Sequence, residues 1–283
     1  MKSDTFPVPG ATIYHEIRGT GPVLLMLPGG GGDANGSDEM AELLAPHATV
    51  VTMDARGYSR STLDSGRPEQ QHVRVQSEDA YLLLRHLTDE PAYVVGGSDG
   101  AIVGLDLLTR HPDVVRGLLA HEPPCFAVLP DAEEHRAFVT EVAHLARTDG
   151  MAAASRRFLG GIGGAMAPAP EPSELTPHQT AMWARLAVNA PIMMEYELCE
   201  FTSYIPDFAT LATQADRLVL AVGADSRHLL PARPAARIAA RLGLEAVDFP
   251  GMHNGARTHT LEFAARVIEL LGIQRYARGG SIQ

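Results

Sequence analysis

One five-residue segment, Gly96-Gly97-Ser98-Asp99-Gly100, constrains this chain more than any other part of its sequence. It directly follows an apolar, strand-like run at 92–95 and directly precedes a run at 101–108 with helical spacing. A strand that turns sharply into a helix can hold a serine on a strained corner if glycines flank it, because glycine permits close backbone approach. The segment therefore predicts an exposed serine nucleophile. The alternative is a glycine-rich turn with an incidental serine, which would need none of the partner residues found elsewhere in the chain.

The rest of the chain alternates between strand-like and helix-like segments. Such alternation predicts an α/β fold, with a mostly parallel sheet covered by helices on both faces. Ser77 is expected to be the N-cap of its helix. The other expected strands are at 12–17, 23–27, 49–53, 115–120, 217–222 and 244–249, and the other expected helices at 39–44, 77–87, 235–242 and 260–271.

The alternation stops between residues 125 and 213. That stretch has helix-like segments at 133–147, 151–158 and 177–188, a proline-rich break at 167–172 and no convincing strand. It is too long for an ordinary connection, so we expect an inserted helical cap. The α/β core would then consist of residues 1–124 and 214–283, ending in a frayed tail at 275–283.

Composition excludes several classes of function. A net charge of −11 argues against a nucleic-acid partner, which would need clustered cationic side chains. No apolar run approaches the roughly 20 residues of a membrane span, and the first residues lack the apolar segment of a signal peptide, so we expect a soluble cytoplasmic protein. Cys125 and Cys199 are then expected to be reduced and buried.

Cofactor and metal chemistry find little support in the sequence. Lys2 is the only lysine, which leaves no lysine for a Schiff base or for a Ser-x-x-Lys nucleophile. The 12 histidines show no metal-binding spacing, and the glycines at 29–32 lack the Lys-Ser/Thr ending of a phosphate loop. We therefore expect no cofactor and no metal, and another residue must activate the serine.

A histidine that takes the serine proton should lie in a loop after the last strand. His253 does so, within Pro250-Gly251-Met252-His253-Asn254-Gly255. This histidine needs a carboxylate to hold its tautomer, and two candidates compete. Asp225 follows the strand at 217–222, and Glu122 follows the strand at 115–120. The carboxyl ends of neighbouring parallel strands lie about 5 Å apart, so either acid could reach the same imidazole.

The negative charge that develops on a substrate oxygen needs at least two preorganised amide donors. One is expected from the residue after the nucleophile, Asp99. The other is expected from residues 28–32, Pro28-Gly29-Gly30-Gly31-Gly32, here called the glycine-rich loop, and Gly30 is our choice.

Taken together, these features resemble the α/β-hydrolase superfamily over nearly the whole chain. Haloalkane dehalogenases and epoxide hydrolases in that superfamily use an aspartate nucleophile, whereas this chain carries Ser98. The motifs that carry the resemblance are the Ser98 turn, the glycine-rich loop, Asp54-Ala55-Arg56-Gly57-Tyr58-Ser59-Arg60-Ser61 and Pro250-Gly251-Met252-His253, with the insertion at the usual cap position.

Within the superfamily, the pattern is most similar to the zearalenone lactone hydrolases. The similarity lies in Pro28-Gly29-Gly30, His121-Glu122-Pro123-Pro124 and Pro250-Gly251-Met252-His253. In that group the glutamate after this strand is the triad acid, which the resemblance maps to Glu122. We favour Glu122 and keep Asp225 as its rival, since this chain has both acids. The cap shows no match to the group, so zearalenone itself is not implied as the substrate.

These inferences predict a serine hydrolase that cleaves an ester or lactone of a medium-sized hydrophobic molecule through an acyl-enzyme. One rival is an acyl transferase, cyclase or C–C hydrolase using the same serine, and another is a non-catalytic receptor. Whether the chain forms a homodimer stays open. The cap residues expected to line an apolar pocket, with packing inside the cap as the alternative for each, are Met182, Trp183, Met193, Met194, Tyr196, Phe201 and Tyr204.

Overall fold

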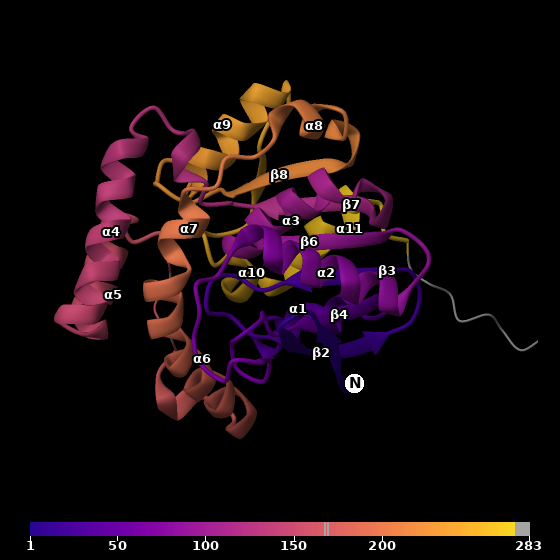
Figure 1. Cartoon of the computed structure of the whole chain (residues 1–283). Coiled ribbons are helices and arrows are strands. Elements are labelled where there is room, and N and C mark those ends of the chain that lie inside the picture. The colour runs from indigo at the N-terminus through magenta and orange to yellow at the C-terminus, as the bar shows by residue number, and fades with distance from the viewer. Residues whose placement is uncertain (167, 169, 275–283) are drawn as a thin grey trace, which may run out of the picture.

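The centre of the molecule is a nine-stranded, mostly parallel sheet, seen in a computed structural model that describes residues 1–166, 168 and 170–274 (Figure 1). The main strand order is β1-β2-β4-β3-β6-β7-β8-β9, and β5 pairs with β2. Strands β1 and β2 run antiparallel to their neighbours, and the six strands from β4 to β9 in this order are parallel. The strands are β1 (Lys2–Val8), β2 (Ala11–Gly19), β3 (Val23–Leu27), β4 (Thr49–Met53), β5 (Thr62–Leu63), β6 (Ala92–Gly97), β7 (Val115–His121), β8 (Leu218–Gly223) and β9 (Val247–Phe249).

The prediction of a mostly parallel α/β sheet is confirmed. The edge strand β1 was not predicted, because its first four residues are polar and exposed and give no apolar alternation. At the other edge, β9 is shorter than the run expected at 244–249.

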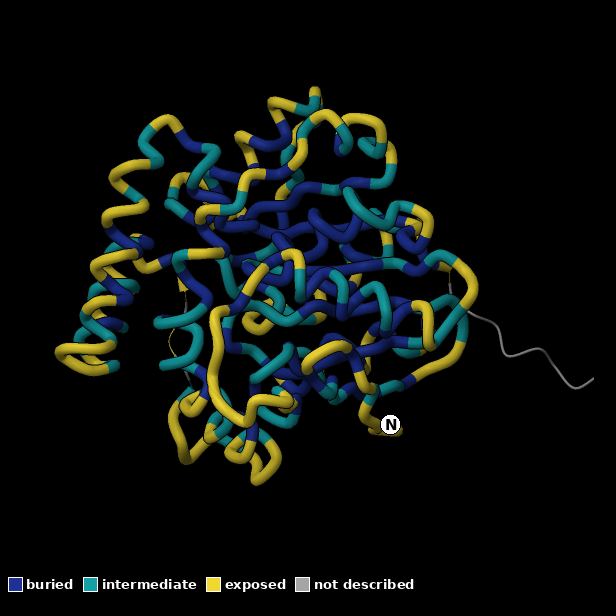
Figure 2. The backbone as a smooth tube through the Cα atoms, viewed as in Figure 1, coloured by how far each residue is buried: buried dark blue, intermediate teal, exposed yellow. Residues whose placement is uncertain are grey.

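Helices cover both faces of the sheet, as predicted, and the buried residues are concentrated along the strands between them (Figure 2). The two helical layers bury separate apolar clusters. Ile102 and Leu105 belong to the cluster on one face, and Met40 and Phe263 to the cluster on the other. The helices of the first face are α2 (Val73–Leu87), α3 (Asp99–Arg110), α8 (Phe208–Ala212) and α9 (Ala232–Leu242), and those of the second are α1 (Asp38–Leu44), α10 (Gly255–Thr258) and α11 (Thr260–Leu271).

The expected helix cap at Ser77 is wrong. Helix α2 begins one turn earlier, with His72 at the N-cap, and Ser77 is buried inside the helix. The reason is tertiary: Val73 packs into the same apolar cluster as Leu84, so burial extends the helix toward its N-terminus.

Residues 125–213, here called the cap segment, contain helices and no strand among their described residues. The helices α4 to α7 lie together at one side of the sheet (Figure 1) and share an apolar cluster that includes Phe138, Val142 and Met194. Helix α6 extends beyond the expected end at 188, passes Pro191 and buries Asn189. The expected break at 167–172 falls partly, and the expected tail at 275–283 wholly, outside the described residues. The helices that share this cluster are α4 (Ala132–Thr148), α5 (Met151–Gly161), α6 (Pro177–Tyr196) and α7 (Leu198–Thr202), whereas α8, also within residues 125–213, packs on the sheet.

The strand register brings the carboxyl ends of four parallel strands to one edge of the sheet. Leu27 pairs with Gly96, Gly97 with His121, and His121 with Ala221. The loops that follow β3, β6, β7 and β8 therefore meet at this edge, which is the usual place for a ligand in an open α/β sheet. Across the described part of the chain, none of the helices has the length and apolar character to cross a membrane.

Candidate active site

Ser98 occupies a strained corner between β6 and α3. Its φ of 54° and ψ of −126° are rare for any residue other than glycine, and such conformations cost about 1–3 kcal/mol each. The Ser98 N–H donates to the His121 carbonyl at 2.9 Å, which fixes the turn to the next strand. A Cβ at Gly96 would overlap the Gly100 carbonyl, and a Cβ at Gly100 would overlap the Leu27 carbonyl. Gly96 and Gly100 are therefore required by close backbone contact.

His253 and Glu122 form a direct pair in the loops beside this corner. The Nδ1 atom of His253 lies 2.7 Å from Oε2 of Glu122, which follows β7 with a φ of 44° and is fully buried. The other carboxylate oxygen, Oε1, accepts hydrogen bonds from the Gly223 N–H at 2.8 Å and from the Ser226 hydroxyl at 2.6 Å. Hydrogen bonds to both carboxylate oxygens therefore fix the Glu122 side chain.

The environment keeps Glu122 ionised. Burial by itself raises the pKa of this carboxyl, but the hydrogen bond to His253, the nearby charge of that ring and the Ser226 hydroxyl together lower the pKa to about 2. A buried carboxylate beside Nδ1 accepts a hydrogen bond from the Nδ1–H group, so the ring keeps its proton on Nδ1 and Nε2 is free to accept a proton. The His253 ring is therefore oriented as a base.

Asp225, the rival acid, lies elsewhere. Its side chain is exposed, while its N–H donates to the Gly251 carbonyl at 3.0 Å. The turn after β8 directs Ser226 inward and leaves Asp225 at the surface, so the structure brings Glu122 and not Asp225 to His253. Sequence reasoning did not single out Ser226, and its only signal was a small hydroxyl residue one position after the rival acid.

The glycine-rich loop lies beside the Ser98 corner. A Cβ added at Gly29 would be 3.5 Å from the Ser98 Cβ, and one added at Gly30 would overlap the Asp99 carboxyl. Asn189 of α6, in the cap segment, holds this loop in place, because its Nδ2 donates a hydrogen bond to the Gly31 carbonyl at 2.9 Å. Asp99 is the first residue of α3, so its N–H is one of the amides that a helix N-terminus leaves without an intrahelical partner.

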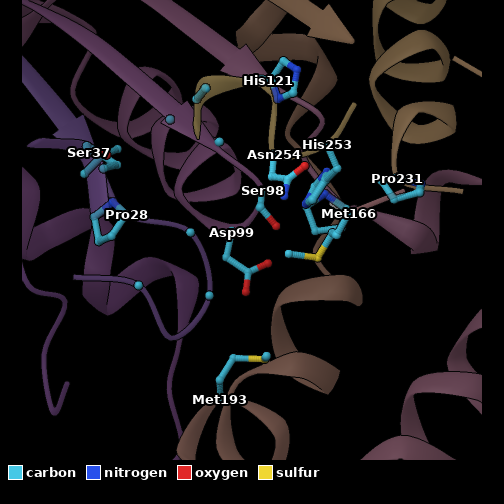
Figure 3. Close-up of a pocket in the computed structure, with 18 of the residues that line it drawn as sticks. Pro28, Ser37, Ser98, Asp99, His121, Met166, Met193, Pro231, His253 and Asn254 are labelled. Carbon is cyan, nitrogen blue, oxygen red and sulfur yellow. The ribbon is translucent and has the colours of Figure 1, made fainter. Parts of the chain in front are cut away.

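Ser98, Asp99 and His253 border one cavity of about 300 Å³ between the sheet edge and the cap segment (Figure 3). The Ser98 hydroxyl points into this space, and the His253 ring borders it from the loop before α10. The backbone of the glycine-rich loop forms another part of the wall. The large apolar side chains on the wall include Phe126, Phe158, Ile162, Met166, Met193 and Leu198.

Of the seven cap residues expected to line an apolar pocket, the four favoured for substrate binding are not among the described residues that border this cavity: Trp183, Met194, Tyr196 and Tyr204. Met194 is buried in the cap cluster, and its neighbour Met193 faces the cavity, because consecutive residues of a helix point about 100° apart. The Tyr204 hydroxyl donates to Asp106 at 3.1 Å on the face of α3. Trp183 borders a separate cavity of about 360 Å³.

Tyr196, at the end of α6, does not border the cavity either, and its carbonyl accepts a hydrogen bond from the Gln71 N–H at 2.9 Å. The sequence supplied the apolar character of these residues, but the phase of α6 decides which side chains reach the cavity. The position along each helix also decides which of the other three expected residues reaches the cavity. Met193 borders the cavity, whereas Met182 and Phe201 do not.

Other histidines and the cysteines lie around or away from this site. His121 borders the cavity, and its Nε2 has no hydrogen-bond partner among the described residues. Burial lowers the pKa of His121 to about 4, so this ring is neutral at physiological pH. His228 is exposed. Cys125 and Cys199 are free thiols; Cys125 is buried as expected, whereas Cys199 is only partly buried. The described part of the chain holds no group of three or more metal-ligating side chains.

The sequence matches the family model described as the alpha/beta hydrolase fold over residues 22–167. The chain is 36% identical to the uncharacterized hydrolase YraK of Bacillus subtilis over 277 residues, which cover 96% of each chain. It is also 34% identical to a zearalenone hydrolase of Bionectria ochroleuca over 119 residues, 41% of this chain and 44% of the relative. Among solved structures, a hydrolase from Pseudomonas aeruginosa superimposes with a TM-score of 0.73 at 20% identity, covering 95% of this chain and 98% of the other. The chain belongs to the α/β-hydrolase family.

Proposed function

We propose that this hydrolase cleaves an ester or lactone through an acyl-enzyme formed on Ser98. The observation that carries the proposal is the buried Glu122 carboxylate 2.7 Å from Nδ1 of His253, on a ring that borders the same cavity as the Ser98 hydroxyl. A serine hydroxyl becomes a nucleophile at neutral pH when a neighbouring imidazole takes its proton. The Ser98 turn, the His253 ring and the Glu122 carboxylate match the roles of such a triad.

The reaction then proceeds in two halves. Nε2 of His253 takes the Ser98 proton while Oγ bonds to the acyl carbon, and Glu122 stabilises the imidazolium. The N–H groups of Gly30 and Asp99 hold the oxyanion, each contributing a factor of about 100 to 1000 in turnover. The tetrahedral intermediate expels the alcohol oxygen, which takes the proton from His253. Water attacks the acyl-enzyme by the same route and regenerates Ser98.

The shape and lining of the cavity support a medium-sized hydrophobic substrate. A volume of about 300 Å³ lies at the lower end of small-molecule sites, and much of its wall is apolar. The partial match to a zearalenone hydrolase supports a lactone as one member of the substrate class. A substrate of this kind would place its carbonyl at Ser98 and its apolar body against residues such as Phe158 and Met193.

Labelling by a fluorophosphonate tests the nucleophile directly. We expect rapid labelling of the wild-type protein and none in Ser98→Ala. Ser65→Ala, which changes an exposed serine away from the cavity, is the control and should still be labelled. Absence of labelling in folded wild-type protein would refute the proposal and favour a non-catalytic receptor. Product analysis with a panel of esters, lactones and diketones, with and without added alcohol, then separates hydrolysis from acyl transfer, cyclisation and C–C cleavage.

A further inference from the structure

Two buried carboxylic acids, Asp99 and Glu197, meet beneath the glycine-rich loop. Asp99 begins α3 in the core, and Glu197 lies between α6 and α7 in the cap segment. The two residues are 6% and 2% exposed, and their side chains share a hydrogen bond. The Gly30 backbone packs against both, since a Cβ added there would overlap Oδ2 of Asp99 and lie 3.2 Å from Oε1 of Glu197.

This contact requires a proton between the two acids. Two carboxylates in buried contact cannot both be ionised, so one of them stays protonated. Burial, opposed by the Glu197 contact and the charge of His253, raises the pKa of Asp99 to about 6, and burial together with the Asp99 charge raises the pKa of Glu197 well above its usual range. No cation compensates for them, because neither acid has an ion pair with an arginine or lysine among the described residues.

The described hydrogen-bond donors around the pair contact Glu197 and not Asp99. Oε2 of Glu197 accepts hydrogen bonds from the Tyr58 hydroxyl at 2.9 Å and from the Gln76 amide at 3.0 Å. No N–H of a described residue donates to the Asp99 carboxyl, which points into the cavity toward Met193 (Figure 3). Asp99 is thus held in place chiefly through the shared proton.

The other titratable groups that face the pair do not supply a positive charge beside it. Tyr58 follows β4, and Cys125 follows β7. Burial raises the pKa of both, and both groups are neutral at physiological pH. His253 acts on Asp99 through its charge and lowers the pKa of that carboxyl when the ring is protonated. The ring carries this charge during each half of the proposed reaction, while the oxyanion exists.

We propose that Asp99 and Glu197 are positioning residues for the oxyanion hole, and that the proton they share must be kept for Ser98 to be acylated. The inference rests on the proposed serine mechanism. With the proton in place, the pair holds Gly30 and the end of α6 together. Loss of the proton puts two negative charges in contact, which separates the side chains and moves Gly30. It also adds a negative charge close to the developing oxyanion, where any anion opposes the reaction.

The experiment compares two isosteric variants with a matched control across neutral to alkaline pH. Asp99→Asn and Glu197→Gln each leave one carboxyl and one amide, so the pair can never reach a double negative charge. Glu200→Gln is the control, because Glu200 is an exposed glutamate of α7 whose carboxylate pairs with His72 and with no other side chain among the described residues. The measurements are the rate of Ser98 labelling by a fluorophosphonate and kcat/KM for 4-nitrophenyl butyrate.

Wild-type protein and Glu200→Gln should both lose activity at alkaline pH, by about tenfold per pH unit once the last shared proton dissociates. Asp99→Asn and Glu197→Gln should lack this alkaline loss, in labelling and in turnover alike. A residue that merely filled space would change stability and leave the pH profile unaltered.

The proposal is overturned if both variants show the same alkaline loss as wild type, or if wild type shows none. Circular dichroism at each pH confirms that the proteins are folded. If Glu197→Gln does not fold, Asp99→Asn carries the test, because it changes a side chain at the cavity wall. Folded wild-type protein that is never labelled would instead remove the serine mechanism itself, and with it this inference.

Discussion

Replacing Glu122 by glutamine separates the role of its charge from that of its shape. In the Gln variant, the Gly223 N–H and the Ser226 hydroxyl still need an acceptor, and the backbone donor cannot reverse its direction. The amide oxygen is therefore held at the Oε1 position, and the new NH₂ group is forced toward Nδ1 of His253. That ring must then accept at Nδ1 and carry its proton on Nε2, so it cannot take the proton of Ser98.

The wrong tautomer lowers turnover by about 10⁴ in the best-studied triad, which corresponds to about 5.5 kcal/mol of transition-state stabilisation. We expect a loss of this size in kcat for 4-nitrophenyl butyrate in Glu122→Gln. KM should change little, because Glu122 is fully buried behind His253 and does not border the cavity. The variant keeps the other two hydrogen bonds of the side chain, so it should remain folded.

The control is Asp225→Asn, which alters an exposed carboxylate and should change kcat by no more than about twofold. Both kcat and the rate of fluorophosphonate labelling are compared at a single pH, with thermal unfolding as the test of folding. A Glu122→Gln enzyme that keeps a tenth of wild-type turnover, or an Asp225→Asn enzyme that is the more severely impaired, would refute the reasoning from the hydrogen bonds.

Three further predictions follow from the same contacts. Ser226→Ala removes a hydroxyl donor from a buried carboxylate and should lower the free energy of unfolding by about 1.5–3 kcal/mol, measured by urea titration against wild type. Gly30→Ala brings a methyl group into overlap with the Asp99 carboxyl, which displaces one oxyanion donor. We expect kcat to fall by about 100- to 1000-fold, and an unchanged rate of Ser98 labelling would contradict this. The pKa of Glu122 is lowered from 4.5 to about 2, so this group contributes about 3 kcal/mol of stability that is present above pH 4.5 and lost as the pH falls toward 2. Acid unfolding of Glu122→Gln should lack that component.

Much of the fold could be predicted from local patterns along the chain. Alternating apolar runs indicated the parallel sheet, because a buried strand and an amphipathic helix each leave a distinct periodicity in sequence. The position of Ser98 followed from glycines that only a tight strand-to-helix turn requires, and His253 followed from its place after the last strand. The structure puts both of these residues on one cavity.

Tertiary structure alone decided which acidic side chains reach the catalytic residues. Glu122 and Asp225 both follow neighbouring parallel strands, and no spacing distinguishes them. The φ of 44° at Glu122 and the turn after β8 send one carboxylate inward and the other to solvent. The pairing of Asp99 with Glu197 joins residues 98 positions apart across the core and the cap segment. Local sequence encodes periodicity and turn geometry, whereas contacts of this kind depend on the phase of a helix and the direction of a loop, which only packing of the whole chain settles.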